Sequence, residues 1–366
     1  MVYKVIGLMS GSSLDGLDIV YTHLEETRGK WSFEIKHADC IPYHPDWVSK
    51  LRHTATLPVS EFLKLNTQYG RYLSDKVNEF IDRHNIHHQV HFIASHGHTV
   101  FHEPENNTTT QIGDGATIAA VTGLPVISDL RSLDVALGGQ GAPIVPIGDK
   151  LLFGGYDYFL NIGGIANITV PHGDSLMAFD VCPANQILNV LAQREGLEID
   201  EDGQLAAQGA LLMDVLSQLN EADYYSQRPP KSLSNEAARD LVFPILLESK
   251  HSTASLLHTT VQHIAEQVAE AIKLFPTAKE QNTMLVTGGG AFNTFLMLHL
   301  QKALESLNVT VAIPDATIVK FKEALIMGLI GALRWREETN VLSSVTGASR
   351  DSISGALWMG HSYSGE

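Results

Sequence analysis

The feature that most restricts the fold of this sequence is a set of four turns rich in glycine or in other small and polar residues. Each turn follows a short apolar segment. They occupy residues 11–16, 163–167, 180–185 and 288–293, so both halves of the chain contain them. Glycine lets backbone N–H groups crowd around an anion, and open α/β sheets bind ligands at the carboxyl ends of their strands. Four such turns therefore predict an α/β protein that binds a nucleotide.

The common phosphate-binding motifs are absent from the sequence. It contains no GxxxxGK[ST] segment, and no GxGxxG opens a helix after the first apolar segment. We therefore expect the phosphates to be held in another way.

The order of the predicted elements indicates two related lobes. A strand, a turn and a second strand are predicted over residues 3–24. The same arrangement is predicted again over residues 156–170, about half a chain later. Apolar spacing of three and four residues predicts helices between these hairpins and after them. They cover residues 60–85, with Ser60 as N-cap and Asn85 as terminator, and residues 115–122, 253–275 and 292–306. This alternation predicts α/β architecture with largely parallel sheets, and 366 residues are enough for two domains.

One helix shows a clear apolar stripe, which predicts a core-facing side. Its members are Leu256, Leu257, Val261, Ile264, Val268 and Ile272.

Composition excludes several classes of partner. The chain has 25 Lys and Arg against 41 Asp and Glu, a net charge of -16, which argues against binding to nucleic-acid phosphates or an anionic membrane. The apolar run at residues 324–333 is about half the roughly 20 residues that a membrane span needs. There is no basic, apolar leader at the N-terminus, and two cysteines make no disulfide framework, so we expect a cytoplasmic protein.

Acidic residues in or near the turns are candidates for catalysis and for metal binding. Asp180 follows apolar residues, where burial raises the proton affinity of a carboxylate and suits it to general base catalysis. Its alternative role is the N-cap of a helix that begins at Pro183. Asp15 and Asp18 offer carboxylates to Mg²⁺ through water, unless residues 10–16 form only a polar β-turn.

Arg131 and Glu323 are candidates for contacts with a substrate. A guanidinium pairs with a carboxylate through two donors, although Asp129 or Asp134 would satisfy Arg131 equally well as a structural ion pair. Glu323 alternatively interacts with the N-terminus of the apolar helix that it begins.

Three histidines, His96, His98 and His102, raise the alternative of a zinc site. Alternate residues of a strand share a face, so three imidazoles at this spacing are able to converge on one ion. With 17 histidines in the chain, such a triplet also arises without a function.

Segments in order from Ile6 to about Trp335 resemble the anhydro-N-acetylmuramic acid kinase family. They are GLMSGSSLDGLD, ASHGHTVFH, QIGDGATIAAVTGLPVISDLRSLDVALGGQGAPIVP, LNIGGIANIT, FDVCPAN, DEDGQLAAQG, TGGGAFN and KEALIMGLIGALRW. The sequence departs from the family pattern at Ser12, where Thr is usual, and at Cys182 and Ala184, which replace glycines of a DxGPGN motif.

The resemblance implies a fold of the actin, hexokinase and Hsp70 type, which is ribonuclease H-like, with two related lobes and the active site in the cleft between them. It implies a first lobe of residues 1–130 and about 340–366, with the phosphate hairpin and sugar contacts. The second lobe, residues 131–339, then carries the second phosphate loop, the nucleoside site and the catalytic Asp.

The resemblance also implies roles for single residues. Asp180 is the catalytic base, His96, Arg131 and Glu323 bind the sugar, and Asp15 lies near Mg²⁺. The ATP-binding residues that it implies are Gly11, Ser12, Ser13, Leu14, Asp15, Gly16, Leu17, Asp18, Gly163, Gly164, Asn167, Gly288, Gly289, Gly290 and Asn293.

The activity that the resemblance implies is an ATP- and Mg²⁺-dependent kinase of peptidoglycan recycling. Water opens the bridge of 1,6-anhydro-N-acetylmuramic acid, and O6 receives the γ-phosphoryl group, giving N-acetylmuramic acid 6-phosphate and ADP. Two alternatives stay open: a levoglucosan kinase-like enzyme, and a nucleotide-gated regulator without catalysis. A homodimer also stays open.

Overall fold

The chain forms two α/β units, which confirms the predicted fold class. The structure is a computed structural model that describes residues 1–11 and 13–360. Unit 1 comprises residues 1–154 and the segment from residue 321 onward, and unit 2 comprises residues 155–320.

These boundaries differ from the predicted 130/131 and 339/340. Residues 131–154 belong to unit 1 because α5 (Pro146–Leu152) packs against β3 (Lys30–Pro42). The boundary at 320/321 falls inside helix α12 (Ala316–Trp335), whose residue Ala324 lies against Gly7 in the first sheet. Neither contact carries a signal in the local sequence.

Unit 1 is built on a seven-stranded sheet in the order β12-β6-β4-β1-β2-β3, with β5 paired to β4. Its other strands are β1 (Val2–Ser10), β2 (Gly16–Thr27), β4 (Phe92–Glu103), β5 (Thr108–Ile112), β6 (Val126–Ser128) and β12 (Ala356–Trp358). Its other helices are α1 (Pro45–His53), α2 (Val59–His84), α3 (Gly115–Thr122), α4 (Ser132–Ala136) and α13 (Ser343–Thr346).

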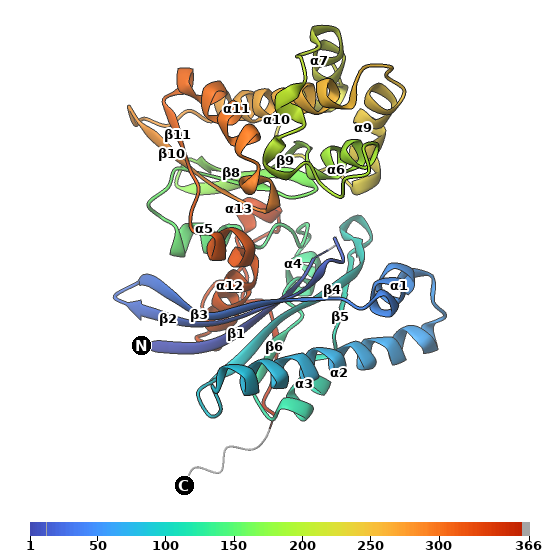
Figure 1. The fold of residues 1–366 in the computed structure, drawn as a ribbon. Helices are drawn as coiled ribbons and strands as arrows, with labels where there is room; N and C mark the ends of the chain where they lie inside the picture. Colours follow the sequence, from blue (N-terminus) through green and yellow to red (C-terminus); the bar gives the residue numbers. More distant parts are fainter. Residues whose placement is uncertain (12, 361–366) are drawn as a thin grey trace. The chain divides into compact units, whose positions relative to one another are not determined.

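Helices cover both faces of this sheet (Figure 1). Because side chains alternate along a strand, Ile19 and Tyr21 of β2 pack in the core beneath α2, whereas Val20 packs with Phe321 and Ala324 of α12. Within unit 1, α2 and α3 lie on one side of the strands in Figure 1 and α12 on the other.

Unit 2 contains a five-stranded sheet in the order β11-β10-β7-β8-β9. The strands are β7 (Tyr158–Ile162), β8 (Ile165–His172), β9 (Ser175–Pro183), β10 (Asn282–Thr287) and β11 (Val309–Ala312). The helices are α6 (Asn185–Gln193), α7 (Met213–Asn220), α8 (Asp223–Ser226), α9 (Asn235–Leu247), α10 (Thr253–Lys273) and α11 (Thr294–Leu304). All six residues of the predicted α10 stripe are buried, which confirms their place in the core.

The two sheets share one topology. In unit 1, β1, β2 and β3 form an antiparallel meander, and β4 and β6 continue the sheet as parallel strands on the other side of β1. In unit 2, β7, β8 and β9 form the same meander, and β10 and β11 are the parallel strands beside β7. The shared order supports the predicted relation between the lobes, but the sheets are mixed and not largely parallel.

Three local predictions are wrong. Ser60 does not cap α2, which begins one residue earlier after Pro58, although Asn85 does terminate it in the left-handed conformation. Asp180 lies inside β9 and not at its end. Glu323 lies in the middle of α12, so it has no N-terminal position in a helix.

No helix in the described part of the chain is long and apolar enough to span a membrane.

Candidate functional site

The hairpin between β1 and β2 is the first predicted site. Leu14 adopts a left-handed conformation with φ of 60°, and Ser13 Oγ donates to Asp15 Oδ1 at 2.8 Å. A Cβ atom on Gly16 would lie 2.7 Å from the carbonyl oxygen of Ile41, so only glycine fits where β2 begins. Leu17 is buried, and Ser12 lies outside the described residues. Asp15 is therefore the exposed acidic group of this turn.

Three carboxyl groups influence one another beside the hairpin. Burial raises the pKa of Asp18 to about 6, opposed by a hydrogen bond with Cys40 and supported by the nearby charges of Asp15 and Glu323. Burial also raises the pKa of Glu323, which Arg131 and Lys322 lower and Asp15 raises. No group of three His, Cys, Asp or Glu side chains in the described residues is placed to hold a metal ion. The structure thus gathers Asp15, Asp18 and Glu323 in unit 1 without a direct metal cage.

Arg131 is held by two neutral acceptors. Its Nε donates to His96 Nε2 at 2.9 Å, and Nη1 donates to the carbonyl oxygen of Gly141 at 2.6 Å. Burial lowers the pKa of the guanidinium to about 10, and Glu323 and Asp134 raise it. His96 Nδ1 lies 2.9 Å from the carbonyl oxygen of Gly97, so His96 carries its proton on Nδ1 and accepts from Arg131. Burial, followed by Arg131, lowers the pKa of His96 to about 3, which keeps the ring neutral.

The alternative of a structural ion pair at Arg131 is not present. Asp134 accepts from Gly141 N at 2.8 Å and from Thr346 Oγ1 at 2.7 Å, and Asp129 accepts from Ser132. Among the described residues, no carboxylate lies within ion-pair distance of Arg131. Nη2 is therefore left to meet another acceptor.

The three clustered histidines do not converge on one ion. His96 contacts Arg131, whereas His98 Nδ1 lies 3.0 Å from Ser10 Oγ and His102 Nδ1 lies 3.1 Å from Thr109 Oγ1. The zinc alternative thus lacks the shared geometry that it needs.

In unit 2, a row of polar residues crosses four neighbouring strands. Thr287 of β10 is in register with Asn161 of β7, Asn161 with Asn167 of β8, and Asn167 with Asp180 of β9. Sequence motifs point to Asn167 and Asp180 but not to Asn161 or Thr287, because the register between strands is not visible in a single segment.

The carboxyl group of Asp180 is fixed by a segment that lies about 50 residues later. Leu233 N and Ser232 Oγ both donate to Oδ2, at 2.8 and 3.2 Å. The backbone N of Asp180 donates to Lys231 O at 3.0 Å, and Tyr224 OH donates to its carbonyl oxygen at 2.7 Å. Burial raises the pKa of Asp180, and the bonds from Leu233 and Ser232 lower it. Among the described residues, both side-chain bonds of Asp180 use Oδ2, which leaves Oδ1 for a proton.

Asp180 is not the cap of a helix. Helix α6 begins at Asn185, and its N-cap is Ala184. The two departures from the family pattern lie where β9 ends and α6 begins. Cys182 is fully buried in β9, and Ala184, the N-cap of α6, donates its backbone N–H to Gly164 O at 2.8 Å.

The glycine turns of unit 2 meet around Asn185. Its backbone N donates to Gly163 O at 3.0 Å, its Nδ2 donates to Ile162 O at 3.0 Å, and a Cβ on Gly289 would lie 3.5 Å from that Nδ2. Gly288 has φ of +81°, and a Cβ there would lie 2.6 Å from Asn161 Oδ1, so glycine is obligatory.

Gly163 and Gly164 differ from Gly288, because a Cβ on either would make no contact closer than 3.6 Å. The fold therefore does not require glycine at residues 163 and 164. Without side chains, the backbone of these two residues is open to a ligand. Gly290 is buried, and the side chain of Asn293 accepts from Leu296 N at 2.9 Å as the N-cap of α11, so Asn293 has a structural role.

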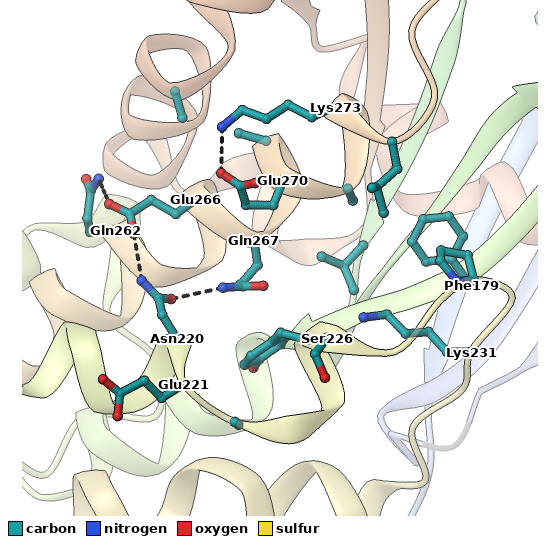
Figure 2. A pocket seen from close by; sticks show the side chains of 18 of the residues that line it. Phe179, Asn220, Glu221, Ser226, Lys231, Gln262, Glu266, Gln267, Glu270 and Lys273 are labelled. Carbon is teal, nitrogen blue, oxygen red and sulfur yellow. Dashed lines mark hydrogen bonds and ion pairs between the residues drawn. The ribbon is translucent and has the colours of Figure 1, made fainter.

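The segment that fixes Asp180 also lines a cavity of about 840 Å³ in unit 2. Phe179 and Val181 line it, whereas Asp180 between them is not one of its lining residues. Figure 2 shows Asn220 bonded to Glu266 and Gln267 within this cavity. None of the predicted site residues lines this cavity.

The fold and these sites define a duplicated α/β protein in which each unit has a tight hairpin turn between its first two strands and polar groups beside it. A family model identifies it more narrowly. Residues 3–360 match the model of the anhydro-N-acetylmuramic acid kinase family, so the chain belongs to this family of kinases.

Individual relatives agree over nearly the whole chain. An anhydro-N-acetylmuramic acid kinase of Sulfurovum sp. is 31% identical over 97% of this chain and 99% of its own length. That of Shewanella loihica is 33% identical over 97% and 98%. Among solved structures, component A of (R)-2-hydroxyglutaryl-CoA dehydratase from Acidaminococcus fermentans aligns with a TM-score of 0.47 and 13% identity, covering 89% of this chain and 96% of that one.

Proposed function

We propose that the chain is an ATP-dependent kinase of 1,6-anhydro-N-acetylmuramic acid that opens the anhydro bridge with water and phosphorylates O6. The products are N-acetylmuramic acid 6-phosphate and ADP. Membership of the kinase family supports the class of reaction. The observation that carries the chemistry is the carboxylate of Asp180, whose Oδ2 accepts two hydrogen bonds while Oδ1 accepts none from the described residues.

Asp180 has the properties of a general base. Two donors fix Oδ2, so Oδ1 keeps one orientation and accepts a proton from water. Burial raises its pKa, which makes the carboxylate a stronger base than an exposed Asp.

The proposed reaction has two steps, hydrolysis of the bridge and phosphoryl transfer. A water oxygen bonds to the anomeric carbon, the bond from that carbon to the bridging oxygen breaks, and Asp180 takes the proton of the water. The freed O6 then bonds to the γ-phosphorus as the bond between that phosphorus and ADP breaks. Positioning and neutralisation of charge supply most of the acceleration in such transfers.

Arg131 is the proposed contact with the lactyl carboxylate of the sugar. Its guanidinium is held in place by His96 and Gly141, and no carboxylate of the described residues pairs with it. A charged, partly buried group that no carboxylate contacts directly favours an anionic ligand. Glu323, on the helix beside it, is a proposed contact with the same sugar.

ATP is the proposed phosphoryl donor, bound by the turns at residues 11–18, 163–167 and 288–293. Oxygen ligands suit Mg²⁺, which keeps several waters, and Asp15 is the exposed carboxylate beside the hairpin. Asp15 would therefore hold Mg²⁺ through water, and the ion would neutralise charge on the phosphates.

Incubation with ATP and anhydro-sugars tests the proposal. We expect 1,6-anhydro-N-acetylmuramic acid to gain the mass of one water plus one phosphoryl group. Levoglucosan, which lacks the acetamido and lactyl groups, should react far more slowly. A gain of the phosphoryl group alone would contradict bridge opening, and no product from either sugar would favour a nucleotide-gated regulator.

A further inference from the structure

Four polar side chains meet inside unit 1, just before the hairpin turn. They are Ser10 at the end of β1, Tyr43 after β3, Tyr69 on α2 and His98 on β4, exposed by 3%, 7%, 0% and 5%. Ser10 and His98 are in register across the parallel strands β1 and β4. Four separate parts of the chain thus converge on the residue from which the turn begins.

The four side chains form one continuous chain of hydrogen bonds. Tyr69 OH and Tyr43 OH lie 2.6 Å apart, Tyr43 OH donates to Ser10 Oγ at 2.7 Å, and Ser10 Oγ lies 3.0 Å from His98 Nδ1. Such buried hydroxyls are costly when one of them lacks a partner.

The number of hydroxyl protons determines which group donates in each of these hydrogen bonds. Tyr43 has one hydroxyl proton and gives it to Ser10, so Tyr69 must donate to Tyr43. The proton of Ser10 then has His98 Nδ1 as its acceptor, which puts the proton of the neutral imidazole on Nε2. With the opposite tautomer, Nδ1–H would donate to Ser10 and the hydrogen bonds would run the other way. The buried hydroxyl proton of Tyr69 would then have no acceptor among the described residues.

The environment keeps these groups in the required states. Burial lowers the pKa of His98 to about 4, so the ring is neutral near pH 7. Burial raises the pKa of Tyr43 to about 12 and that of Tyr69 well above its ordinary value, so both keep their protons.

We propose that His98, Tyr43 and Tyr69 are positioning residues that hold the Ser10 hydroxyl away from the ligand and thereby fix the start of the turn at residues 11–16. In this arrangement Ser10 donates to His98 and not to a phosphate, and the backbone and side chains after Ser10 are left to contact the nucleotide. The inference rests on the proposed function only in naming that ligand.

The first test is independent of any activity. In ¹⁵N-labelled protein, long-range ¹H–¹⁵N correlations report which ring nitrogen of a histidine carries the proton, and loss of a signal in H98Q assigns it. We expect the Nε2–H tautomer for His98 at pH 7. The Nδ1–H tautomer would overturn the proposal, because His98 would then donate to Ser10 instead of accepting its proton.

The second test shows which ring nitrogen of His98 supports nucleotide binding. The amide of Asn lies where Nδ1 lies in His, and that of Gln lies where Nε2 lies. H98Q and Y43F should weaken binding of a non-hydrolysable ATP analogue about twofold to tenfold, as expected for one lost hydrogen bond. H98N should recover most of the loss, because its carbonyl still accepts from Ser10.

Two controls make the result specific. Tyr72 packs against Tyr43 with ring centroids 5.9 Å apart but takes no part in the chain, so Y72F should bind the analogue normally. The double variant S10A/H98Q should bind no worse than S10A, because both act through one hydrogen bond. Circular dichroism identifies any variant that fails to fold.

The outcomes distinguish this proposal from the proposed function. Equal weakening in H98N and H98Q, or additive losses in the double variant, would overturn the positioning role. A wild-type protein that binds no nucleotide would refute the proposed function and the link to a nucleotide turn, while the tautomer result would remain.

Discussion

At the scale of single residues, Asp180 is the side chain on which the proposed chemistry depends most. In Asp180→Asn, the amide oxygen still accepts from Leu233 N, but the side chain no longer takes a proton. We expect turnover to fall by about 10²- to 10⁴-fold, the range that general base catalysis supplies. Steady-state kinetics with the anhydro-sugar measure this.

Nucleotide binding to the same variant should be unchanged. Asp240 is exposed on α9, so D240N is the matched control and should keep full turnover. Near wild-type turnover in D180N would show that Asp180 is not the base.

Ser232 gives a pH-dependent prediction. Its hydroxyl donates to Asp180 Oδ2, and this bond lowers a pKa that burial raises. The base must be deprotonated, so kcat/KM falls as pH drops through the pKa. Ser232→Ala removes a lowering contact, and we expect the acidic limb of the pH profile to move to higher pH.

Ser226→Ala is the control, because Ser226 Oγ donates to Asp223 O and does not contact Asp180. Its profile should coincide with that of the wild type. If the acidic limb of the S232A pH profile stayed where it is in the wild type, a group other than Asp180 would control the profile.

Single residues also show what the sequence is able to predict. Asp180, Arg131 and His96 stand in recognisable segments, and the structure gives each a defined set of partners. Ser232 and Leu233, which orient Asp180, lie about 50 residues away in a segment without a motif. Only the folded chain brings such partners together.

At the scale of elements, the contact between β1 and α12 gives a stability prediction. A Cβ on Gly7 would overlap the backbone carbonyl of Ala324 and come within 3.0 Å of Gly328 N. Backbone atoms do not yield easily, and overpacking typically costs 1–3 kcal/mol. We expect Gly7→Ala to lower the free energy of unfolding by about 3 kcal/mol in urea denaturation.

Gly155 supplies the control, since a Cβ there has nothing within 4 Å. G155A should change stability by less than about 0.5 kcal/mol. A G7A variant as stable as the wild type would mean that α12 does not approach β1 so closely.

Helices were more predictable than strand pairing. The apolar spacing of α10 places its core residues correctly, and α3 covers the predicted residues 115–122. The predicted N-cap of α2 is wrong because Ser60 lies one residue inside the helix, which begins without a side-chain cap. Parallel and antiparallel pairing depends on long-range contacts, so the mixed sheets were not foreseen.

At the scale of the whole molecule, the duplicated topology is the feature that the sequence indicated best. The two strand–turn–strand segments become the first hairpins of two sheets in which five corresponding strands follow the same order, while the sheet of unit 1 has two further strands. The boundaries of the two compact units differ from those predicted for the lobes, because they depend on how α5 and α12 pack and not on any break in composition.

The central claim is that the enzyme acts on a sugar that carries a carboxylate, which Arg131 binds. Losing a hydrogen bond to a charged group typically costs about 1.5–3 kcal/mol, or roughly a tenfold to hundredfold loss in efficiency. Because His96 and Gly141 hold Arg131, its removal should affect a neutral anhydro-sugar much less.

The most direct measurement is the ratio of kcat/KM on 1,6-anhydro-N-acetylmuramic acid to that on levoglucosan, for the wild type and Arg131→Ala. We predict that the wild type prefers the muramic acid and that the ratio falls about tenfold to hundredfold in the variant. Equal losses on both sugars, or a wild-type preference for levoglucosan, would contradict the account.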